Sequence, residues 1–175
     1  MLQATYSKYL LNFKQPAGTS RGILTEKETW FIKIWHPEQP EIYGLGECAL
    51  FRGLSAEDTP DYEKKLAYIC QNINTLIPNE LKGLSSIRFG LSTAIADLNN
   101  GGKRIIYPSP FTKGRKDIEI NGLIWMGDKE TMRQRIIEKL DAGFHCVKLK
   151  IGAIDFDASL GGAAEKAAAY QPPAC

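Results

Sequence analysis

The sequence is poor in the residues that build several common kinds of site. Only two histidines occur among its 175 residues, and the four cysteines, Cys48, Cys70, Cys146 and Cys175, form no CxxC pair. This distribution argues against a structural zinc site. Scattered single cysteines are instead typical of reduced thiols in a cytosolic protein. We therefore expect a cytoplasmic protein.

Long apolar runs and an excess of one charge are also missing. No stretch approaches the ~20 apolar residues that a membrane-spanning helix needs. The start of the chain lacks the apolar core and the cleavage site of a signal peptide. Lysine and arginine number 22 against 20 aspartate and glutamate, and no basic stripe with interleaved aromatic residues is visible. We therefore expect a soluble protein that binds neither membrane nor nucleic acid.

Apolar and aromatic residues predict strands in the first fifty residues. In the stretch 28–36, every second residue from Trp30 to Ile34 is large and apolar, which is the pattern of a strand with one buried face. The stretches 5–13 and 42–50 are similarly rich in apolar residues, and the last contains glycines that bend the strand or allow close backbone approach. We expect an antiparallel meander.

A long segment separates the first two of these strands. Residues 14–26 are rich in glycine, proline, threonine and serine. A segment of this length is long for a hairpin turn, and long loops often cover a binding site. We expect a mobile loop here.

Two helices follow the meander. Ser55 is placed to cap the first, and apolar residues recur at helical spacing as far as Leu76, before Pro78 ends it. The second helix is expected over 85–99, with an apolar face, and an asparagine-glycine run stops it. That face comprises Ile87, Leu91, Ala94, Ile95 and Leu98. Strands followed by helices predict an α+β unit, to which we assign residues 1–105.

The pattern changes after this unit. Proline and glycine mark a linker at 107–116. A strand at 118–127, a helix capped by Asp128 and a strand at 145–152 then form one βαβ unit, whose strands should be parallel. One such unit cannot cover its own sheet, so we expect residues 106–157 to begin a larger barrel.

The last segment cannot complete that barrel. Residues 158–175 contain seven alanines, and Leu160 is their only large aliphatic residue. We expect a low-complexity, non-native tail, and therefore a barrel that is cut short.

Two lysines lie on one side of the last predicted strand. Successive side chains of a strand face opposite ways, so Lys148 and Lys150 share one face while Val147 and Leu149 share the other. On an edge strand, such lysines face water and discourage aggregation. In a closed (β/α)8 barrel they point inward near the mouth, where active sites lie. Neighbouring positive charges and partial burial lower the pKa of a lysine, which suits a general base.

The order of these elements, with Lys-x-Lys on the second barrel strand, resembles the muconate lactonizing branch of the enolase superfamily. The segments 44–57, 86–98 and 121–152 carry the resemblance, which spans about residues 1–157. It implies an α+β capping domain followed by the first βαβ unit of a truncated (β/α)8 barrel. Within the branch, the chain looks most like the dehydratases of menaquinone biosynthesis, which act on a cyclohexadiene carboxylate. Dipeptide epimerases, N-acylamino acid racemases and muconate cycloisomerases use the same lysines.

The resemblance also implies roles for residues of this chain. Lys150 matches the catalytic lysine that removes the proton α to the substrate carboxylate, and Lys148 matches its electrostatic partner. Two capping-domain loops, one containing residues 18–22 and the other residues 50–53, would close over the substrate. An ordinary loop residue is the alternative for each contact expected there. Those contacts are Thr19, Ser20, Arg21 and Phe51.

The magnesium site of the superfamily is not expected in this chain. The family binds Mg²⁺ through acidic residues on the third, fourth and fifth barrel strands, which lie beyond the resemblance. Glu119, Asp155 and Asp157 do not match them, so we expect no metal ligands among this chain's own residues. A full-length parent would bind Mg²⁺ and a small carboxylate substrate, and the chain alone should be inactive.

A different class of function also fits the sequence. In a non-catalytic α+β interaction module with a disordered tail, Lys148 and Lys150 would lie on a solvated edge strand. The sequence leaves the oligomeric state open.

Overall fold

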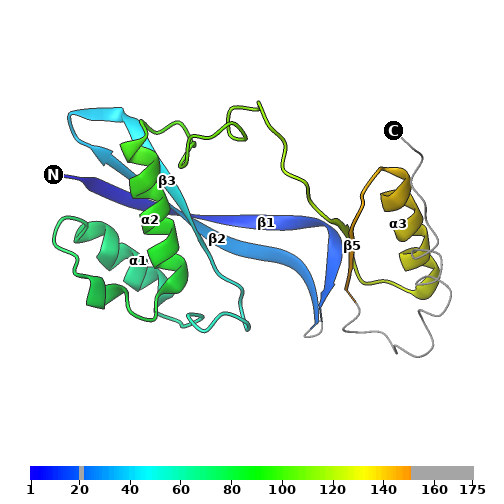
Figure 1. Ribbon diagram of the computed structural model, residues 1–175. Coiled ribbons are helices and arrows are strands. Elements are labelled where there is room, and N and C mark those ends of the chain that lie inside the picture. Colours follow the sequence, from blue (N-terminus) through cyan, green and yellow to red (C-terminus); the bar gives the residue numbers. More distant parts are fainter. Residues whose placement is uncertain (20–21, 151–175) are drawn as a thin grey trace. The chain divides into compact units, whose positions relative to one another are not determined.

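The computed structural model describes residues 1–19 and 22–150. They fall into two compact units (Figure 1). The first unit holds residues 1–14 and 25–116, and the second holds residues 15–24 together with the described part from Asp117 onward. The predicted tail at 158–175 lies outside the described residues, as do Ser20 and Arg21.

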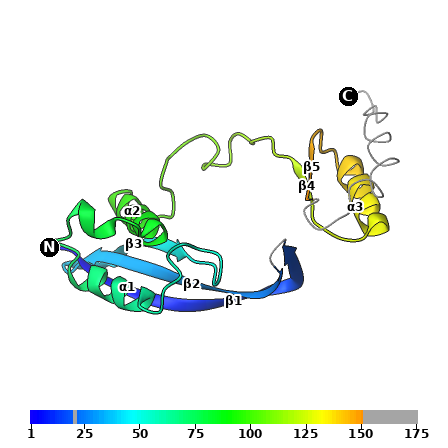
Figure 2. The same ribbon diagram turned by 90° about the horizontal axis from the view of Figure 1, so that it is seen from below.

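Three strands form an antiparallel sheet in the order β1–β2–β3, which confirms the predicted meander. They are β1 (Gln3–Thr19), β2 (Gly22–His36) and β3 (Gln39–Ala49). β1 and β2 lie side by side in both ribbon views (Figures 1 and 2). Strands β2 and β3 pair from Thr29–Ala49 to Trp35–Tyr43, and the register shifts between Trp35 and His36.

The prediction of a mobile loop at 14–26 is wrong for the described residues. Strand β1 continues to Thr19 and β2 already begins at Gly22. The segment includes Ile23 and Thr25, whose β-branched side chains favour extended structure. Pairing also satisfies backbone groups that a loop would leave to water. The strands therefore extend well beyond the stretches that alternation marked.

Two α-helices and a short 3₁₀-helix pack on the sheet. They are α1 (Tyr62–Gln71), η1 (Pro78–Leu81) and α2 (Ser85–Asn99). The core contains the buried alternating residues of β2, as predicted, together with residues of both α-helices. Its buried members are Trp30, Ile32, Ile34, Cys48, Leu50, Tyr62, Leu66, Ile69, Cys70, Ile87, Leu91 and Ala94. None of the described helices is long and apolar enough to cross a membrane.

The cap predicted at Ser55 is wrong, because α1 begins only at Tyr62. Pro60 explains the late start. The residue before a proline is disfavoured in helical conformation, so Thr59 ends the preceding turns and the helix starts beyond it. The Ser55 hydroxyl instead accepts a hydrogen bond from the backbone N–H of Phe51, at 2.9 Å.

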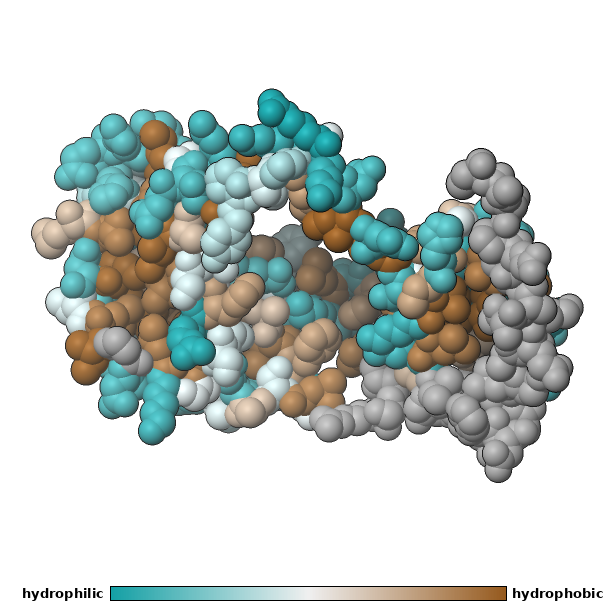
Figure 3. Space-filling model, viewed as in Figure 1, coloured by the Kyte–Doolittle hydropathy of each residue, from teal (hydrophilic) through white to brown (hydrophobic). Residues whose placement is uncertain are grey.

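Helix α2 matches its predicted bounds but not all of its predicted face. Ile87, Leu91 and Ala94 are buried, whereas Ile95 is exposed. Apolar surface is visible over α1 and α2 in Figure 3. The buried residues of α2 also include Asp97, which was not part of the predicted face.

Glycines let α2 approach β3 closely. A Cβ atom on Gly44 would clash with the carbonyl oxygen of Ala94, and one on Gly46 would clash with that of Gly90. Gly90 itself faces the Cys48 sulfur. This confirms that the glycines of this strand serve close backbone approach.

The second unit contains a parallel βαβ arrangement, as predicted. Strands β4 (Gly122–Ile124) and β5 (Val147–Leu149) are parallel, and α3 (Lys129–Asp141) connects them. The Asp128 carboxylate caps α3 by accepting a hydrogen bond from the backbone N–H of Thr131, at 2.9 Å. Both strands are shorter than expected.

A small core holds these elements together. Ile124, Met132 and Ile136 are buried, and partly buried neighbours pack around them. Those neighbours are Leu140, Val147 and Leu149. One face of the strand pair is therefore covered by α3.

Candidate functional site

The two predicted catalytic lysines follow one another along the end of β5. Val147 and Leu149 pack on the core with α3, while Lys148 is exposed and stands opposite Leu123 in the register. The backbone N–H of Lys150 donates to the carbonyl oxygen of Ile124, at 3.0 Å. The structure thus places both lysines at the carboxyl end of β5, which pairs in parallel with β4.

An aromatic residue lies beside Lys150. The ring centroid of Trp125, the residue after β4, is 5.9 Å from the Lys150 ammonium nitrogen. The Arg135 guanidinium on α3 donates to the carbonyl oxygen of Trp125, at 3.1 Å. Sequence reasoning did not single out Trp125. An aromatic residue directly after an apolar strand of a βαβ unit was the available signal.

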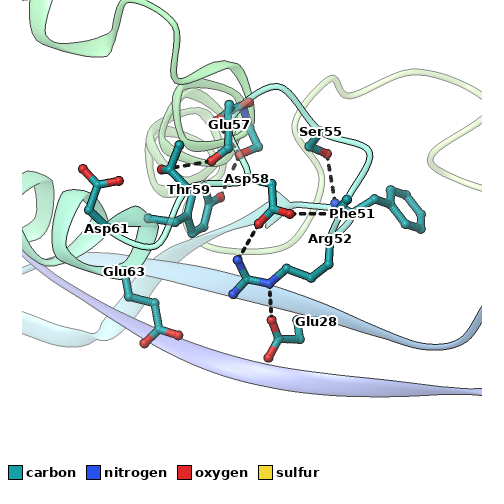
Figure 4. Close-up of polar contacts among 12 residues, drawn as sticks. Glu28, Phe51, Arg52, Ser55, Glu57, Asp58, Thr59, Asp61 and Glu63 are labelled. Atoms are coloured by element: carbon teal, nitrogen blue, oxygen red, sulfur yellow. Dashed lines mark hydrogen bonds and ion pairs between the residues drawn. The ribbon is translucent and has the colours of Figure 1, made fainter.

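In the first unit, an arginine fixes the segment after β3 (Figure 4). Arg52 donates to the carboxylates of Glu28 at 2.6 Å and Asp58 at 2.7 Å, and its guanidinium lies 5.3 Å from the Trp30 ring centroid. The backbone N–H of Gly53 also donates to Asp58, at 2.6 Å. This hydrogen bond, followed by that from Arg52, holds the pKa of the Asp58 carboxyl below its usual value.

A buried carboxylate ties the same segment to α2. Glu57, only 9% exposed, accepts hydrogen bonds from the backbone N–H of Ser86 at 2.7 Å and from its hydroxyl at 2.8 Å. The Tyr62 hydroxyl is 2.7 Å from the Ser86 hydroxyl, and burial raises the pKa of Tyr62. A carboxylate at a helix N-terminus is favourably placed. The segment 50–61 is therefore anchored at several points.

Phe51 projects from this anchored segment. In Figure 4 its ring points away from the Arg52–Asp58 contacts, and the residue is 37% exposed. The Lys27 ammonium lies 5.2 Å from the ring centroid and 3.3 Å from a Glu47 oxygen. The side chain is thus accessible on a fixed backbone.

A second polar contact supports Lys27 and Glu47. The Thr29 hydroxyl, which is buried, donates to Glu47 at 2.7 Å. This bond, opposed by partial burial and reinforced by Lys27, lowers the pKa of the Glu47 carboxyl. Glu47 therefore stays ionised and keeps Lys27 near Phe51.

The predicted contact residues are distributed over both units. Phe51 belongs to the first, whereas Thr19, at the end of β1, and the lysines belong to the second. Ser20 and Arg21 lie outside the described residues. Substrate contact by these four residues remains a prediction.

The described residues do not fit a magnesium ion. Within residues 1–19 and 22–150, no three histidine, cysteine, aspartate or glutamate side chains gather closely enough to hold a metal. Magnesium requires six oxygen ligands in octahedral geometry. Glu119 is an exposed residue outside the strands, and Asp155 and Asp157 lie beyond the described residues.

Comparison with solved structures defines the class of fold. The crystal structure of MenC from Desulfotalea psychrophila LSv54 matches with a TM-score of 0.67 and 27% identity, over 86% of this chain and 49% of that chain. O-succinylbenzoate synthase from Thermosynechococcus elongatus BP-1, complexed with Mg in its active site, matches with a TM-score of 0.68 and 17% identity. That match covers 98% of this chain and 49% of that chain. The fold is that of the amino-terminal half of enolase-superfamily proteins.

Sequence comparison points to a particular relative. The chain is 34% identical over 190 residues to o-succinylbenzoate synthase from D. psychrophila, a match that covers 89% of this chain and 51% of the relative. No family model matches. The chain spans about half the length of the curated relative. These matches confirm the resemblance to the enolase superfamily and to o-succinylbenzoate synthase, and they confirm the α+β capping unit followed by a βαβ unit.

Proposed function

We propose that this chain carries the capping domain and the base-bearing strand of a lyase of the o-succinylbenzoate synthase type. The 34% identity to that enzyme, over 89% of this chain, is the observation that supports the proposal. The placement of Lys148 and Lys150 at the carboxyl end of β5, a strand paired in parallel with β4, agrees with it. In this proposal, residues 1–105 form the capping domain and residues 106–157 begin the barrel.

Lys150 is the proposed general base. Its neutral amine takes the proton α to the carboxylate of a cyclohexadiene substrate, and negative charge develops on that carboxylate. The bond from the β-carbon to its hydroxyl then breaks, and the removed proton goes to the departing oxygen. Loss of this one water gives an aromatic ring. Lys148 contributes a fixed positive charge that stabilises the developing negative charge. The product would serve menaquinone biosynthesis in the cytoplasm.

The capping residues have a separate proposed role. Phe51, Thr19, Ser20 and Arg21 contact the substrate and exclude water from the reacting carbons. Phe51 is the best placed by its surroundings, because its backbone is fixed and its ring remains accessible.

A divalent metal ion would supply Lewis-acid stabilisation of the enolate in a full-length parent. Among residues 1–19 and 22–150 no three potential ligands gather to hold it, and in this proposal the ligands come from outside this chain. We accordingly expect the 175-residue chain alone to be inactive.

A chimera tests the proposal. Residues 1–150 of this chain are joined to the remaining half of the D. psychrophila o-succinylbenzoate synthase, and dehydration of the cyclohexadiene acid is followed with Mg²⁺ present. We expect turnover, and a loss of about 10²–10⁴-fold in Lys150→Ala. Lys116→Ala, at an exposed linker position, is the matched control. A folded chimera without dehydration, or one that is indifferent to Lys150→Ala, would contradict the proposal.

A related reaction is the second candidate. Structures of dipeptide epimerases share this fold, and a lysine that removes an α-proton suits 1,1-proton transfer as well as dehydration. A panel of dipeptides and N-acylamino acids in the same assay separates these activities. Epimerisation without dehydration would favour the second candidate.

A non-catalytic interaction module is the alternative from another class. The exposure of Lys148 is the observation that favours it. In that case the folded chimera does not dehydrate the cyclohexadiene acid, whereas the lyase proposal requires turnover that depends on Lys150.

A further inference from the structure

Trp125 and Lys150 occupy equivalent places at the carboxyl ends of neighbouring parallel strands. Lys150 follows β5 and Trp125 follows β4, and the hydrogen bond from Lys150 N–H to the Ile124 carbonyl joins the strands directly before them. The ammonium nitrogen lies 5.9 Å from the indole centroid. A cation within about 6 Å of an indole face is attracted by the negative face of the ring.

The backbone of Trp125 is held by a side chain of α3. The Arg135 guanidinium on α3 donates to the carbonyl oxygens of Trp125 at 3.1 Å and Met126 at 3.4 Å. A Cβ atom on the next residue, Gly127, would lie 3.3 Å from the Thr131 side chain. The turn after β4 is therefore fixed to α3, and the indole has a defined position.

The indole nitrogen of Trp125 differs from the backbone groups around it in its hydrogen bonding. Within the part of the chain that the structure describes, the buried Nε1 atom of Trp125 has no hydrogen-bond partner. A buried N–H without a partner costs stability, and phenylalanine would fill an apolar site without that cost. Folding alone therefore does not favour tryptophan over phenylalanine here, whereas the indole face attracts a cation more strongly than a phenyl face does.

The Trp125 indole is the neighbour that can stabilise the positive charge of Lys150. Lys148 lies two residues away on the same strand face, and Arg135, from α3, is engaged with backbone carbonyls. None of the ion pairs among residues 1–19 and 22–150 involves Lys150. The Trp125 ring lies beside the ammonium, at 5.9 Å.

We propose that Trp125 is a positioning residue for Lys150, whose amine it holds at the strand end through the indole face. The role rests on the proposed function of Lys150 as a base, but the contact itself can be measured in the 175-residue chain without any activity.

Trace acetylation tests the contact. The chain is labelled with limiting acetic anhydride at pH 8, and peptide mass spectrometry gives the relative rates at Lys148 and Lys150. Acetylation requires an amine that is free to react, so removal of the ring that contacts the ammonium in Trp125→Leu should raise the Lys150 rate about two- to five-fold. Lys148 should not change, and Trp125→Phe, which keeps an aromatic face, should stay within about twofold of the unchanged chain.

Trp35→Leu is the matched control, because Trp35 has a lysine partner of its own, Lys33, at 5.3 Å. It should leave Lys150 unchanged. An unchanged Lys150 rate in folded Trp125→Leu would overturn the inference, as would equal effects of Trp125→Leu and Trp125→Phe.

If Trp125→Leu does not fold, the acetylation rates at Lys148 and Lys150 should rise equally. A second measurement then tests the contact. In the unchanged chain, reductively ¹³C-methylated, the ring current should move the Lys150 signal upfield of the Lys148 signal. Coincident signals would overturn the inference. An inactive chimera with an intact contact would count against the proposed function only, and an active chimera without the contact against this inference only.

Discussion

The buried carboxylate of Asp97 and the guanidinium of Arg104 form an ion pair where α2 ends. Asp97 is 1% exposed, and it also accepts hydrogen bonds from the backbone N–H of Leu45 at 3.0 Å and of Arg104 at 2.7 Å. One side chain thus joins the end of α2 to β3.

Replacement of Asp97 by alanine should destabilise the first unit by about 2–3 kcal/mol, because it leaves the backbone N–H of Leu45 without its acceptor and removes the ion-pair partner of Arg104. Urea unfolding followed by circular dichroism measures the loss. Asp117→Ala, at an exposed position, is the control and should change stability by less than about 0.5 kcal/mol. Equal stability of the two variants would contradict the structural role of Asp97.

A second prediction concerns the close contact between β3 and α2. Gly46→Ala places a methyl group against the Gly90 carbonyl, and overpacking of this kind costs about 1–3 kcal/mol. Gly18→Ala is the matched control, because a Cβ atom there meets nothing within 4 Å. The same urea experiment compares them, and a tolerated Gly46→Ala would show that α2 can move away from the sheet.

The contacts of Glu28 make stability depend on pH. A hydrogen bond from Lys8, and a further one from Arg52, lower the pKa of the Glu28 carboxyl below 4.5 in the folded state. The stabilisation is therefore fully present above about pH 4.5 and is lost as pH falls through the lower folded-state pKa. Glu28→Gln should reduce the loss of stability between pH 6 and pH 3, measured as the urea midpoint at each pH.

Glu38→Gln serves as the control for this pH dependence, since Glu38 is exposed in the turn before β3. Its pH profile should match that of the unchanged chain. Identical profiles for Glu28→Gln and the unchanged chain would show that the Lys8 and Arg52 contacts contribute nothing.

Thiol reactivity should separate the cysteines. Burial raises the pKa of Cys48 to about 12 and that of Cys70 to about 11, whereas Cys146 is exposed. The thiolate is the reactive form, so at pH 8 in a Cys175→Ser background only Cys146 should react rapidly with a disulfide reagent. Addition of Cys146→Ser should abolish the rapid phase until denaturant is added. A rapid phase that persists would show that the core around Cys48 opens readily.

Local patterns predicted the elements that depend on local chemistry. Alternation found the buried positions of β2, and the Asp128 cap and the parallel pairing of β4 and β5 followed from capping and spacing rules. The same rules predicted that Lys148 and Lys150 share one strand face, and the structure places both at the end of β5. These features need only near neighbours in the chain.

Features set by distant partners escaped the same rules. Asp97 is buried because Leu45 and Arg104, from other parts of the chain, supply its donors. Trp125 gains its significance from Lys150, which is far along the sequence. The start of α1 depends on nearby residues and was still predicted wrongly, because Pro60 outweighed the capping potential of Ser55.

The close approach of β3 to α2 at Gly44 and Gly46 has a consequence for the segment 50–61. The segment 50–61 leaves the end of β3 and is fastened to the first turn of α2 through Glu57 and Ser86. Since β3 and α2 are locked backbone to backbone, the two attachment points keep a constant separation. A substitution at Phe51 can therefore reshape the surface that this residue presents without disturbing the backbone of the segment.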